Sequence, residues 1–146
     1  MPYLTIVVAD LEASGPVLDV QLGNSQTGQQ ALQQQHQAVP GPLPIRALVD
    51  TGADMCVIED GLARQLNLTL IGFQLLAGGL TGSTASGTTP VPEYSASLLL
   101  PNGIPFDITA IEISLPSGLQ MLIGRDVLAK GSFLYEGLND RFTLTF

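Results

Sequence analysis

The chain has 146 residues, of which 45% are hydrophobic and 12% charged, and its formal net charge is −8. This length and composition predict a single globular domain over residues 1–146, with a sizeable core, and exclude a disordered chain. Five Lys and Arg residues are too few for a basic patch, so we expect no nucleic-acid partner and no polybasic membrane anchor.

Cysteine and histidine each occur once, as Cys56 and His36. One Cys excludes an intrachain disulfide, and together the two residues are too few for a protein-ligated zinc site. We therefore expect no metal and no cofactor. The N-terminal stretch lacks the features of a signal peptide, and no window approaches the roughly 18 apolar residues of a membrane span. A soluble, cytoplasmic protein is the expectation.

Along the chain, sixteen Gly and ten Pro residues among many β-branched ones favour short strands and tight turns. We expect residues 4–9 and 16–22 to form a first hairpin. A polar, Gln-rich segment at about residues 23–42 follows, and it predicts an exposed loop insertion in which His36 is solvated. The next strand is expected over residues 43–49.

The second half continues as strands with short helices between them. Further strands are expected at residues 55–58, 70–77, 91–100, 104–113, 120–123, 132–135 and 141–146. Asn102-Gly103 predicts a hairpin between two of them, and Pro90 and Pro92 indicate an edge or a bend. Residues 59–66 and 125–130 fit one or two helical turns each. The fold class that follows is all-β, with one or two small helices.

The stretch LVDTGAD, residues 48–54, ends an apolar strand on an acid. Asp50 could simply cap the strand by binding local N–H groups, because Asp and Gly are common turn residues. A phosphate-binding hairpin of the sugar-kinase and actin type needs two α/β lobes and a longer chain. The third interpretation is the catalytic turn of an aspartic peptidase.

The surroundings of this turn favour the third interpretation. VDTGADMCVIED is followed by a glycine-rich stretch at residues 78–82 and then by MLIGRDVL at residues 121–128. In content and order these resemble the DTGAD turn, the flap and the Gly-Arg-(Asn/Asp) junction of the retropepsin family, the small dimeric aspartic proteases typified by retroviral proteases. The resemblance spans roughly residues 43–128. It implies a retropepsin-like acid protease fold, a single lobe like a closed β-barrel, assembled as a homodimer.

The resemblance also implies roles for individual residues. Asp50 would be catalytic, Thr51 would hydrogen-bond across the dimer axis, and Gly52 would let the substrate backbone approach closely. Arg125 would hold the active site structurally through Asp54. The residues expected to bind substrate are Leu48, Ala53, Asp54, Met55, Val57, Gly78, Gly79, Leu80 and Leu122. Cys56, between two pocket positions, is expected to be a small buried residue.

The function that follows is an aspartic endopeptidase acting on peptide or protein substrates. A pair of carboxylates that shares one proton can activate water, and one chain supplies only one Asp-Thr-Gly, so the second must come from another copy. The alternative is a non-catalytic dimerisation or peptide-binding module of the same fold. A zinc peptidase of related fold is a weaker option, because no His/Cys/Glu cluster is present.

Overall fold

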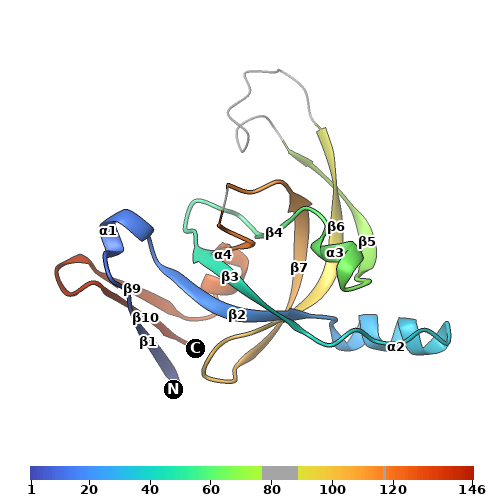
Figure 1. The fold of residues 1–146 in the computed structure, drawn as a ribbon, viewed down its shortest axis with the longest axis horizontal. Helices are drawn as coiled ribbons and strands as arrows, with labels where there is room; N and C mark the ends of the chain where they lie inside the picture. The colour runs from blue at the N-terminus through green and yellow to red at the C-terminus, as the bar shows by residue number, and fades with distance from the viewer. Residues whose placement is uncertain (77–88, 117) are drawn as a thin grey trace.

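The computed structural model describes residues 1–76, 89–116 and 118–146 (Figure 1). In chain order its elements are β1 (Tyr3–Val7), α1 (Leu11–Ser14), β2 (Val17–Gly23), α2 (Gln26–Gln34), β3 (Leu43–Val49), β4 (Cys56–Glu59), α3 (Leu62–Gln65), β5 (Thr69–Leu76), β6 (Thr89–Leu99), β7 (Pro105–Ile113), β8 (Met121–Ile123), α4 (Arg125–Leu128), β9 (Ser132–Glu136), the 3-10 turn η1 (Gly137–Asn139) and β10 (Arg141–Thr145). The prediction of a mostly β protein is confirmed, but the described residues contain four short α-helices where one or two were expected.

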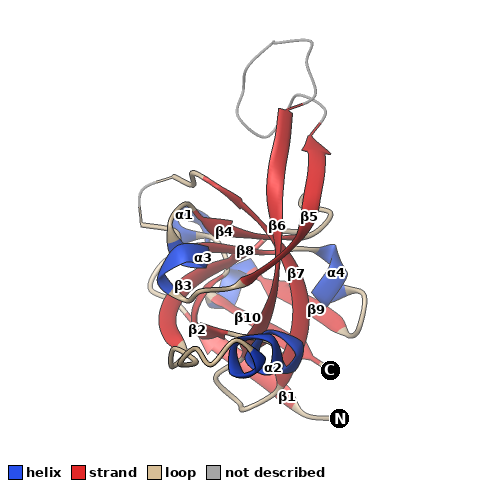
Figure 2. Cartoon of the chain, turned by 90° about the vertical axis from the view of Figure 1, so that its right-hand side faces the viewer, coloured by secondary structure: helices blue, strands red, loops and turns tan. Residues whose placement is uncertain are grey.

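The larger sheet closes on itself. Its strand order is β2-β3-β8-β4-β7-β6-β5, and an additional pairing of β2 with β6 joins the first strand to the sixth. Burial alternates along β2, so one face of the strand lies on the core and the other faces solvent. The buried residues are Leu18, Val20 and Leu22, and the exposed ones are Asp19 and Gln21. β5 is left outside the closure as an edge strand, and β5 and β6 project together beyond the other strands (Figure 2).

A second sheet joins the two ends of the described chain. Its order is β1-β10-β9, with both pairings antiparallel, so β1 and β10 bring the N- and C-terminal ends side by side (Figure 1). Phe142 and Leu144 of β10 are buried in the main core, and Leu4 and Ile6 of β1 pack against it. We call β1, β10 and β9 the terminal sheet.

The expected hairpin between residues 4–9 and 16–22 is wrong. β1 pairs with β10, whereas β2 pairs with β3 and β6. The intervening α1 redirects the chain: the Asp10 carboxylate accepts a hydrogen bond from the Ala13 N–H, as an N-cap residue does, and Gly15 ends the helix at a φ of 70°. Two strands separated by a capped helix cannot form a tight hairpin.

The Gln-rich segment is also more ordered than the expected loop, because it contains α2. The Ser25 hydroxyl accepts a hydrogen bond from the Gly28 N–H at 3.0 Å and caps the helix. Leu32 is buried, and the neighbouring Asn24 amide donates to the Leu66 carbonyl at 2.7 Å, which attaches the segment to the barrel. His36 is exposed, as expected.

Other local predictions are confirmed. β6 and β7 form an antiparallel hairpin through the expected Asn-Gly turn, where Gly103 has a φ of 84°. Pairing of β6 with β7 begins at Glu93, so among the described residues no strand pairs with Pro90 and Pro92 on that side of β6. β9 and β10 form the expected closing hairpin.

Candidate active site

Asp50 follows β3 directly, and β8 holds its backbone. β8 runs parallel to β3, with Leu122 beside Leu48 and Ile123 beside Val49. The ladder continues one residue further, because the Asp50 N–H donates to the Ile123 carbonyl at 3.0 Å. The carboxylate therefore leaves the chain at the end of a paired, buried strand, and it is partly exposed.

The turn after Asp50 is closed by its own hydrogen bonds. The Gly52 N–H donates to Asp50 Oδ1 at 2.8 Å, and the Ala53 N–H donates to the Asp50 carbonyl at 3.2 Å. A Cβ at position 52 would lie 3.1 Å from Asp50 Oδ1, so a side chain there would crowd the carboxylate. The three residues predicted to be catalytic thus form one turn, with Thr51 and Gly52 exposed and Ala53 buried behind them.

Arg125, the first residue of α4, makes three contacts with the same turn. Its backbone N–H donates to the Ala53 carbonyl at 2.9 Å, and its Nη1 donates to the Thr51 carbonyl at 2.8 Å. Its Nη2 forms an ion pair with the Asp54 carboxylate. The two side chains are 52% and 85% exposed, so the ion pair adds little to stability by itself. The guanidinium instead links two points of the turn to α4.

Gly124 lies so close to Met55, the residue that follows this turn, that no side chain would fit at position 124. A Cβ at this position would lie 2.5 Å from both the carbonyl carbon and the carbonyl oxygen of Met55. Because these are backbone atoms, they cannot rotate away. The glycine of the Gly-Arg-Asp stretch is thus required by packing between the end of β8 and the start of β4, a role that the sequence motif alone did not reveal.

Asp126 is a second residue whose contribution the sequence did not show. Its carboxylate accepts from the Cys56 N–H at 3.1 Å, from the Cys56 thiol at 3.3 Å and from the Val127 N–H at 3.0 Å. Cys56 is fully buried, as expected, and burial raises the pKa of its thiol well above the ordinary value. The thiol therefore stays protonated and donates to Asp126. Only the fold brings these residues, seventy positions apart, into contact.

Four of the residues predicted to bind substrate, Leu48, Met55, Val57 and Leu122, belong to one apolar cluster that is separate from the main core. Leu122 lies beside Leu48 on one side and beside Val57 on the other, and opposed residues on neighbouring strands share a face. Sequence reasoning missed the other members, because only the fold brings them together from β5, β6, β7 and the segment after β7: Leu76, Val91, Ile111, Ile113, Leu115 and Leu119. We call these ten residues the apolar cluster.

The apolar cluster adjoins the acidic turn. Leu48 lies two residues before Asp50 on a ladder that continues through Asp50, so the alternation of a strand sends both side chains to the same face. Of the remaining predicted residues, Gly78, Gly79 and Leu80 lie outside the described residues. β5 and β6, which flank them in sequence, pair antiparallel with each other.

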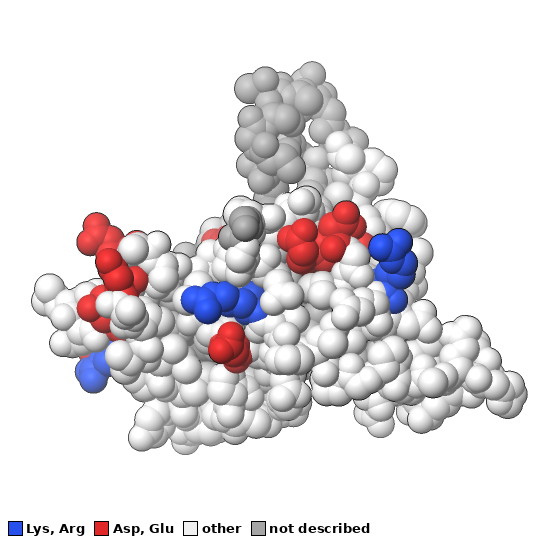
Figure 3. Space-filling view, viewed as in Figure 1, with Lys and Arg blue, Asp and Glu red and all other residues white. Residues whose placement is uncertain are grey.

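Within the three described ranges, no cluster of His, Cys, Asp and Glu has the three or more members needed to hold a metal ion. None of the helices described is both long enough and apolar enough to cross a membrane. On the face in Figure 3, the Lys and Arg side chains are separated from one another and do not form a patch.

The sequence matches a known protein family over much of its length. Residues 38–127, more than half of the chain, match the family described as aspartyl protease. This range contains both the Asp50 turn and the Gly124-Arg125 junction. No curated protein matches the sequence.

Solved structures give a likeness of fold. A retropepsin-like aspartic protease from Rickettsia conorii is 17% identical, with a TM-score of 0.57 over 98% of this chain and 91% of that chain. The EIAV protease complexed with the inhibitor HBY-793 is 16% identical, with a TM-score of 0.48 over 79% of this chain and 86% of that one. The retroviral protease-like domain of Ddi1 from Leishmania major is 16% identical, with a TM-score of 0.38 over 83% and 82%.

The first of these likenesses extends over nearly the whole chain, so it shows the fold. The family match includes the turn that contains Asp50 and the Gly124-Arg125 junction that is hydrogen-bonded to it. The chain therefore belongs to the aspartyl protease family, and its fold is retropepsin-like.

Proposed function

We propose that the protein is an aspartic endopeptidase that acts as a homodimer, with one Asp50 from each subunit in a shared active site. The chain contains one Asp-Thr-Gly and no second copy of it. Two carboxylates about 3 Å apart cannot both ionise, so such a pair holds a single proton and provides an acid and a base together. One chain supplies half of that pair.

One observation carries this proposal: the Asp50 carboxylate is fixed by a closed turn and is still partly open to solvent. The Gly52 N–H donates to one of its oxygens, and β8 pairs with the strand that carries it. Arg125 hydrogen-bonds to the turn, and Gly124 packs against the residue that follows the turn. A carboxylate that only capped the strand would need no such support. Catalytic groups do need it, because a positional error of about 1 Å can reduce a rate roughly 100-fold.

In the proposed mechanism, the ionised Asp50 takes a proton from a water molecule that lies between the two carboxylates. The protonated Asp50 of the other subunit gives its proton to the scissile carbonyl oxygen. Attack of the water thus gives a neutral tetrahedral diol. The proton taken from the water then passes to the leaving nitrogen. As the C–N bond breaks, one hydroxyl of the diol returns its proton to a carboxylate, and the pair again holds one proton. No residue of the protein becomes covalently attached to the substrate.

Substrate binding is proposed to involve the apolar cluster and the residues around the turn. Leu48, Met55, Val57 and Leu122 would form apolar pockets, which predicts hydrophobic side chains on both sides of the cleaved bond. Ala53 and Asp54 would line the cleft. Gly78, Gly79 and Leu80 would belong to a flap, formed between β5 and β6, that covers the bound peptide by strand addition.

Two further residues, Thr51 in the turn and Arg125 beside it, would keep the active site in its catalytic geometry. Thr51 would hydrogen-bond to its counterpart across the dimer axis and hold the two turns at a fixed separation. Arg125 would keep each turn rigid through its bonds to Thr51 and Asp54.

The alternative is a dimerisation or peptide-binding module of the same fold, in which the two Asp50 carboxylates do not come close enough to share a proton. It predicts that peptides bind without being cleaved.

The test is Asp50→Asn, which keeps the shape of the side chain and its acceptor for the Gly52 N–H but removes the shared proton. Cleavage of a denatured protein substrate should be lost, whereas the melting temperature and the dimer should be preserved. Asp107→Asn, which alters an exposed carboxylate on β7, is the matched control and should leave activity unchanged. Full activity in Asp50→Asn would falsify the catalytic assignment. Peptide binding without cleavage by the unaltered protein would favour the binding module.

A further inference from the structure

β5 and β6 form a two-stranded arm that extends beyond the rest of the larger sheet (Figure 2). Residues 72–76 of β5 pair with residues 89–93 of β6. β6 pairs with β7 only from Glu93 onward, and β5 pairs with β6 alone among the described residues. The arm therefore has two free edges, one along each strand, and these edges differ in chemistry.

The free edge of β6 is protected by two prolines. Pro90 lies opposite Leu75, and Pro92 lies opposite Phe73. Proline has no N–H, and the pairing of β5 with β6 continues past both residues, so the missing N–H groups belong to the outer edge of β6. Prolines on an edge prevent another strand from pairing there. This side of the arm is therefore closed to strand addition.

The free edge of β5 has no such protection. Residues opposite each other in a non-hydrogen-bonded pair direct their N–H and carbonyl groups outward, so Phe73 and Leu75, opposite the prolines, direct theirs away from β6. Residues 65–76 include no proline and no charged side chain. A bulge before Gly72 interrupts the strand, so its regular part runs over residues 72–76. We call residues 72–76 the β5 edge.

The side chains that the β5 edge presents to solvent are apolar. Phe73 is 63% exposed, and Leu75 is 65% exposed. The alternation of a strand places both on the face opposite to Gln74, whose amide donates to the Glu93 carboxylate at 2.7 Å. Exposed apolar side chains beside an open strand edge are typical of a surface that binds another chain.

The β5 edge begins at the apolar cluster of the proposed active site. Leu76, its last residue, belongs to that cluster, and so does Val91, which lies opposite Gln74. At roughly 3.4 Å per residue, the edge extends about 17 Å outward from the cluster. An extended chain that leaves the cluster at Leu76 can therefore continue along the edge for several residues.

We propose that the β5 edge binds an extended, apolar segment of the protein substrate, distinct from the residues that enter the pockets. The segment would add as a strand to β5 and bond to the outward groups of Phe73 and Leu75. Its alternate side chains would lie beside these two, and apolar cross-strand pairs are favourable. This inference deepens the proposed function and rests on it for its occupant. It predicts a preference for unfolded chains with an apolar, β-forming stretch near the cleaved bond.

A second copy of the chain is a less suitable occupant. The proposed dimer is built around the two Asp50 turns, and a contact between two β5 strands in addition to it would join dimers into larger assemblies. The bulge before Gly72 also limits the regular row of outward groups on each strand. A substrate segment needs only one such row.

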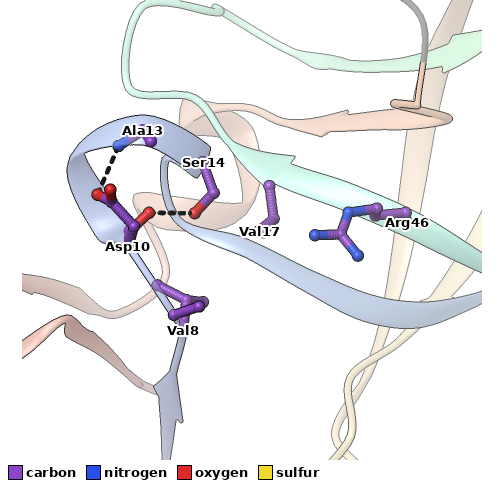
Figure 4. Close-up of a pocket in the computed structure, with 7 residues that line it drawn as sticks. Val8, Asp10, Ala13, Ser14, Val17 and Arg46 are labelled. Atoms are coloured by element: carbon purple, nitrogen blue, oxygen red, sulfur yellow. Dashed lines mark hydrogen bonds between the residues drawn. The ribbon is translucent and has the colours of Figure 1, made fainter.

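The pocket beside α1 is a less suitable place for an apolar segment. It has a volume of about 420 Å³, and its lining includes Asp10 and Arg46 (Figure 4). Asp10 caps α1, but Arg46 forms no ion pair within the parts of the chain that the structure describes. An apolar segment there would cover an uncompensated charge, which costs free energy.

Peptide binding to the Asp50→Asn variant tests the proposal without cleavage. The short probe is a fluorescent peptide of about eight residues with hydrophobic side chains on both sides of its central bond. Two long probes carry about six more residues, alternating Val and Thr, at the N-terminal or the C-terminal end, which matches the length of the β5 edge. One long probe should bind about tenfold more tightly than the short one in fluorescence anisotropy. A control probe with Gly and Ser in the extension should bind like the short one, and equal affinities for all probes would overturn the proposal.

Variants of Leu75, made in the same background, separate pairing of the backbone from contact of the side chain. Leu75→Pro removes an outward N–H, as Pro90 does on β6, and should abolish the tighter binding of the long probe. Leu75→Ala is the matched control: it loses the same side chain but keeps the N–H, so it should keep most of the gain. Thermal melts check that both variants are folded. Equal loss of the gain in both would contradict strand addition.

Phe73→Lys tests the edge without a proline. A charged side chain beside an apolar strand should remove the preference for the long probe over the short one. Leu138→Lys is the matched control, because Leu138 is fully exposed and β9 and β10, which flank it, lie on the opposite side of the barrel from β5 (Figure 1). This control should bind every probe like its Asp50→Asn parent. An unchanged preference in Phe73→Lys would overturn the proposed site.

The results distinguish this proposal from the proposed function. Tighter binding of a long probe, with no cleavage of any probe by the unaltered protein, would contradict the proposed function alone. Cleavage of short and long probes with equal kcat/KM, together with equal affinities, would contradict the β5 edge alone. Variants of Leu75 that change sedimentation in analytical ultracentrifugation, and not peptide binding, would assign the edge to a second copy.

Discussion

Gly124→Ala is the substitution for which the structure gives the sharpest expectation. The backbone of Gly124, with φ −89° and ψ −176°, is one that any residue adopts, so alanine adds no conformational strain. Its Cβ, however, would lie 2.5 Å from the Met55 carbonyl carbon and oxygen and 2.9 Å from the Met55 Cα, where ordinary contacts are 3.4–4 Å. The end of β8 and the start of β4 must therefore separate by roughly 1 Å, as overpacked cores do.

The magnitudes follow from that displacement. Overpacking of this kind costs about 1–3 kcal/mol, and each kcal/mol lowers the melting temperature by about 2–4 °C in a protein of this size. Met55 follows the turn that contains Asp50, and the turn moves with it. Under the proposed function, a shift of about 1 Å at the reacting groups should lower kcat/KM by roughly 100-fold.

Thermal melts and peptide cleavage measure the two effects, with Gly41→Ala as the matched control. A Cβ at Gly41 meets nothing within 4 Å, so this variant should melt and cleave like the unaltered protein. If Gly124→Ala were equal to Gly41→Ala in both assays, the close approach of Gly124 to Met55 would be refuted. A lower melting temperature with unchanged kcat/KM would keep the contact but refute its effect on the site.

Two further predictions concern residues near the turn. Arg125→Lys should lower the melting temperature by no more than a few degrees, because the ion pair is exposed. It should reduce kcat/KM about tenfold, because lysine lacks the planar fork whose two nitrogens bind the Thr51 carbonyl and Asp54 separately. Unchanged kcat/KM would contradict this role. Burial raises the pKa of the Cys56 thiol. Above about pH 8.5 the unfolded chain therefore loses a proton that the folded chain keeps. The free energy of unfolding then falls with rising pH by up to about 1.4 kcal/mol per pH unit. Urea unfolding should show that Cys56→Ala lacks this part of the slope, and equal slopes would show that the thiol is not protected.

The parts of the site that the sequence predicted are the parts fixed by local chemistry. The turn of Asp50, Thr51 and Gly52 closes through bonds between neighbours, and the Asn102-Gly103 hairpin follows from the backbone preference of glycine. The assignment of Leu48 and Leu122 to one apolar surface came from the family resemblance and not from periodicity.

The parts that the sequence did not predict depend on distant partners or on caps. β1 has the pattern of a strand, but nothing in that pattern distinguishes pairing with β2 from pairing with β10, whose residues lie about 138 positions away. The caps at Asp10 and Ser25, which define α1 and α2, follow a rule that can be read from sequence. The pattern after Ser25 predicts a loop because only Ala31 and Leu32 interrupt the polar run from Gln26 to Gln37.

The contributions of Gly124 and Asp126 required the fold itself. A glycine needed for close approach looks the same in sequence as one needed for a turn, and here the φ of Gly124 is ordinary. Asp126 stabilises the floor of the site by accepting from two groups of Cys56, a contact that exists only because α4 follows β8 between β3 and β4.

These features assign different tasks to different parts of the chain. β8, Gly124 and Arg125 hold the Asp50 turn from within the same chain, so under the proposed function each subunit builds its half of the site before it meets a partner. In the proposed dimer, two Asp50 carboxylates lie side by side, and their repulsion opposes assembly until one of them takes up a proton. Assembly and protonation are then linked, so whatever favours the shared proton also favours the dimer.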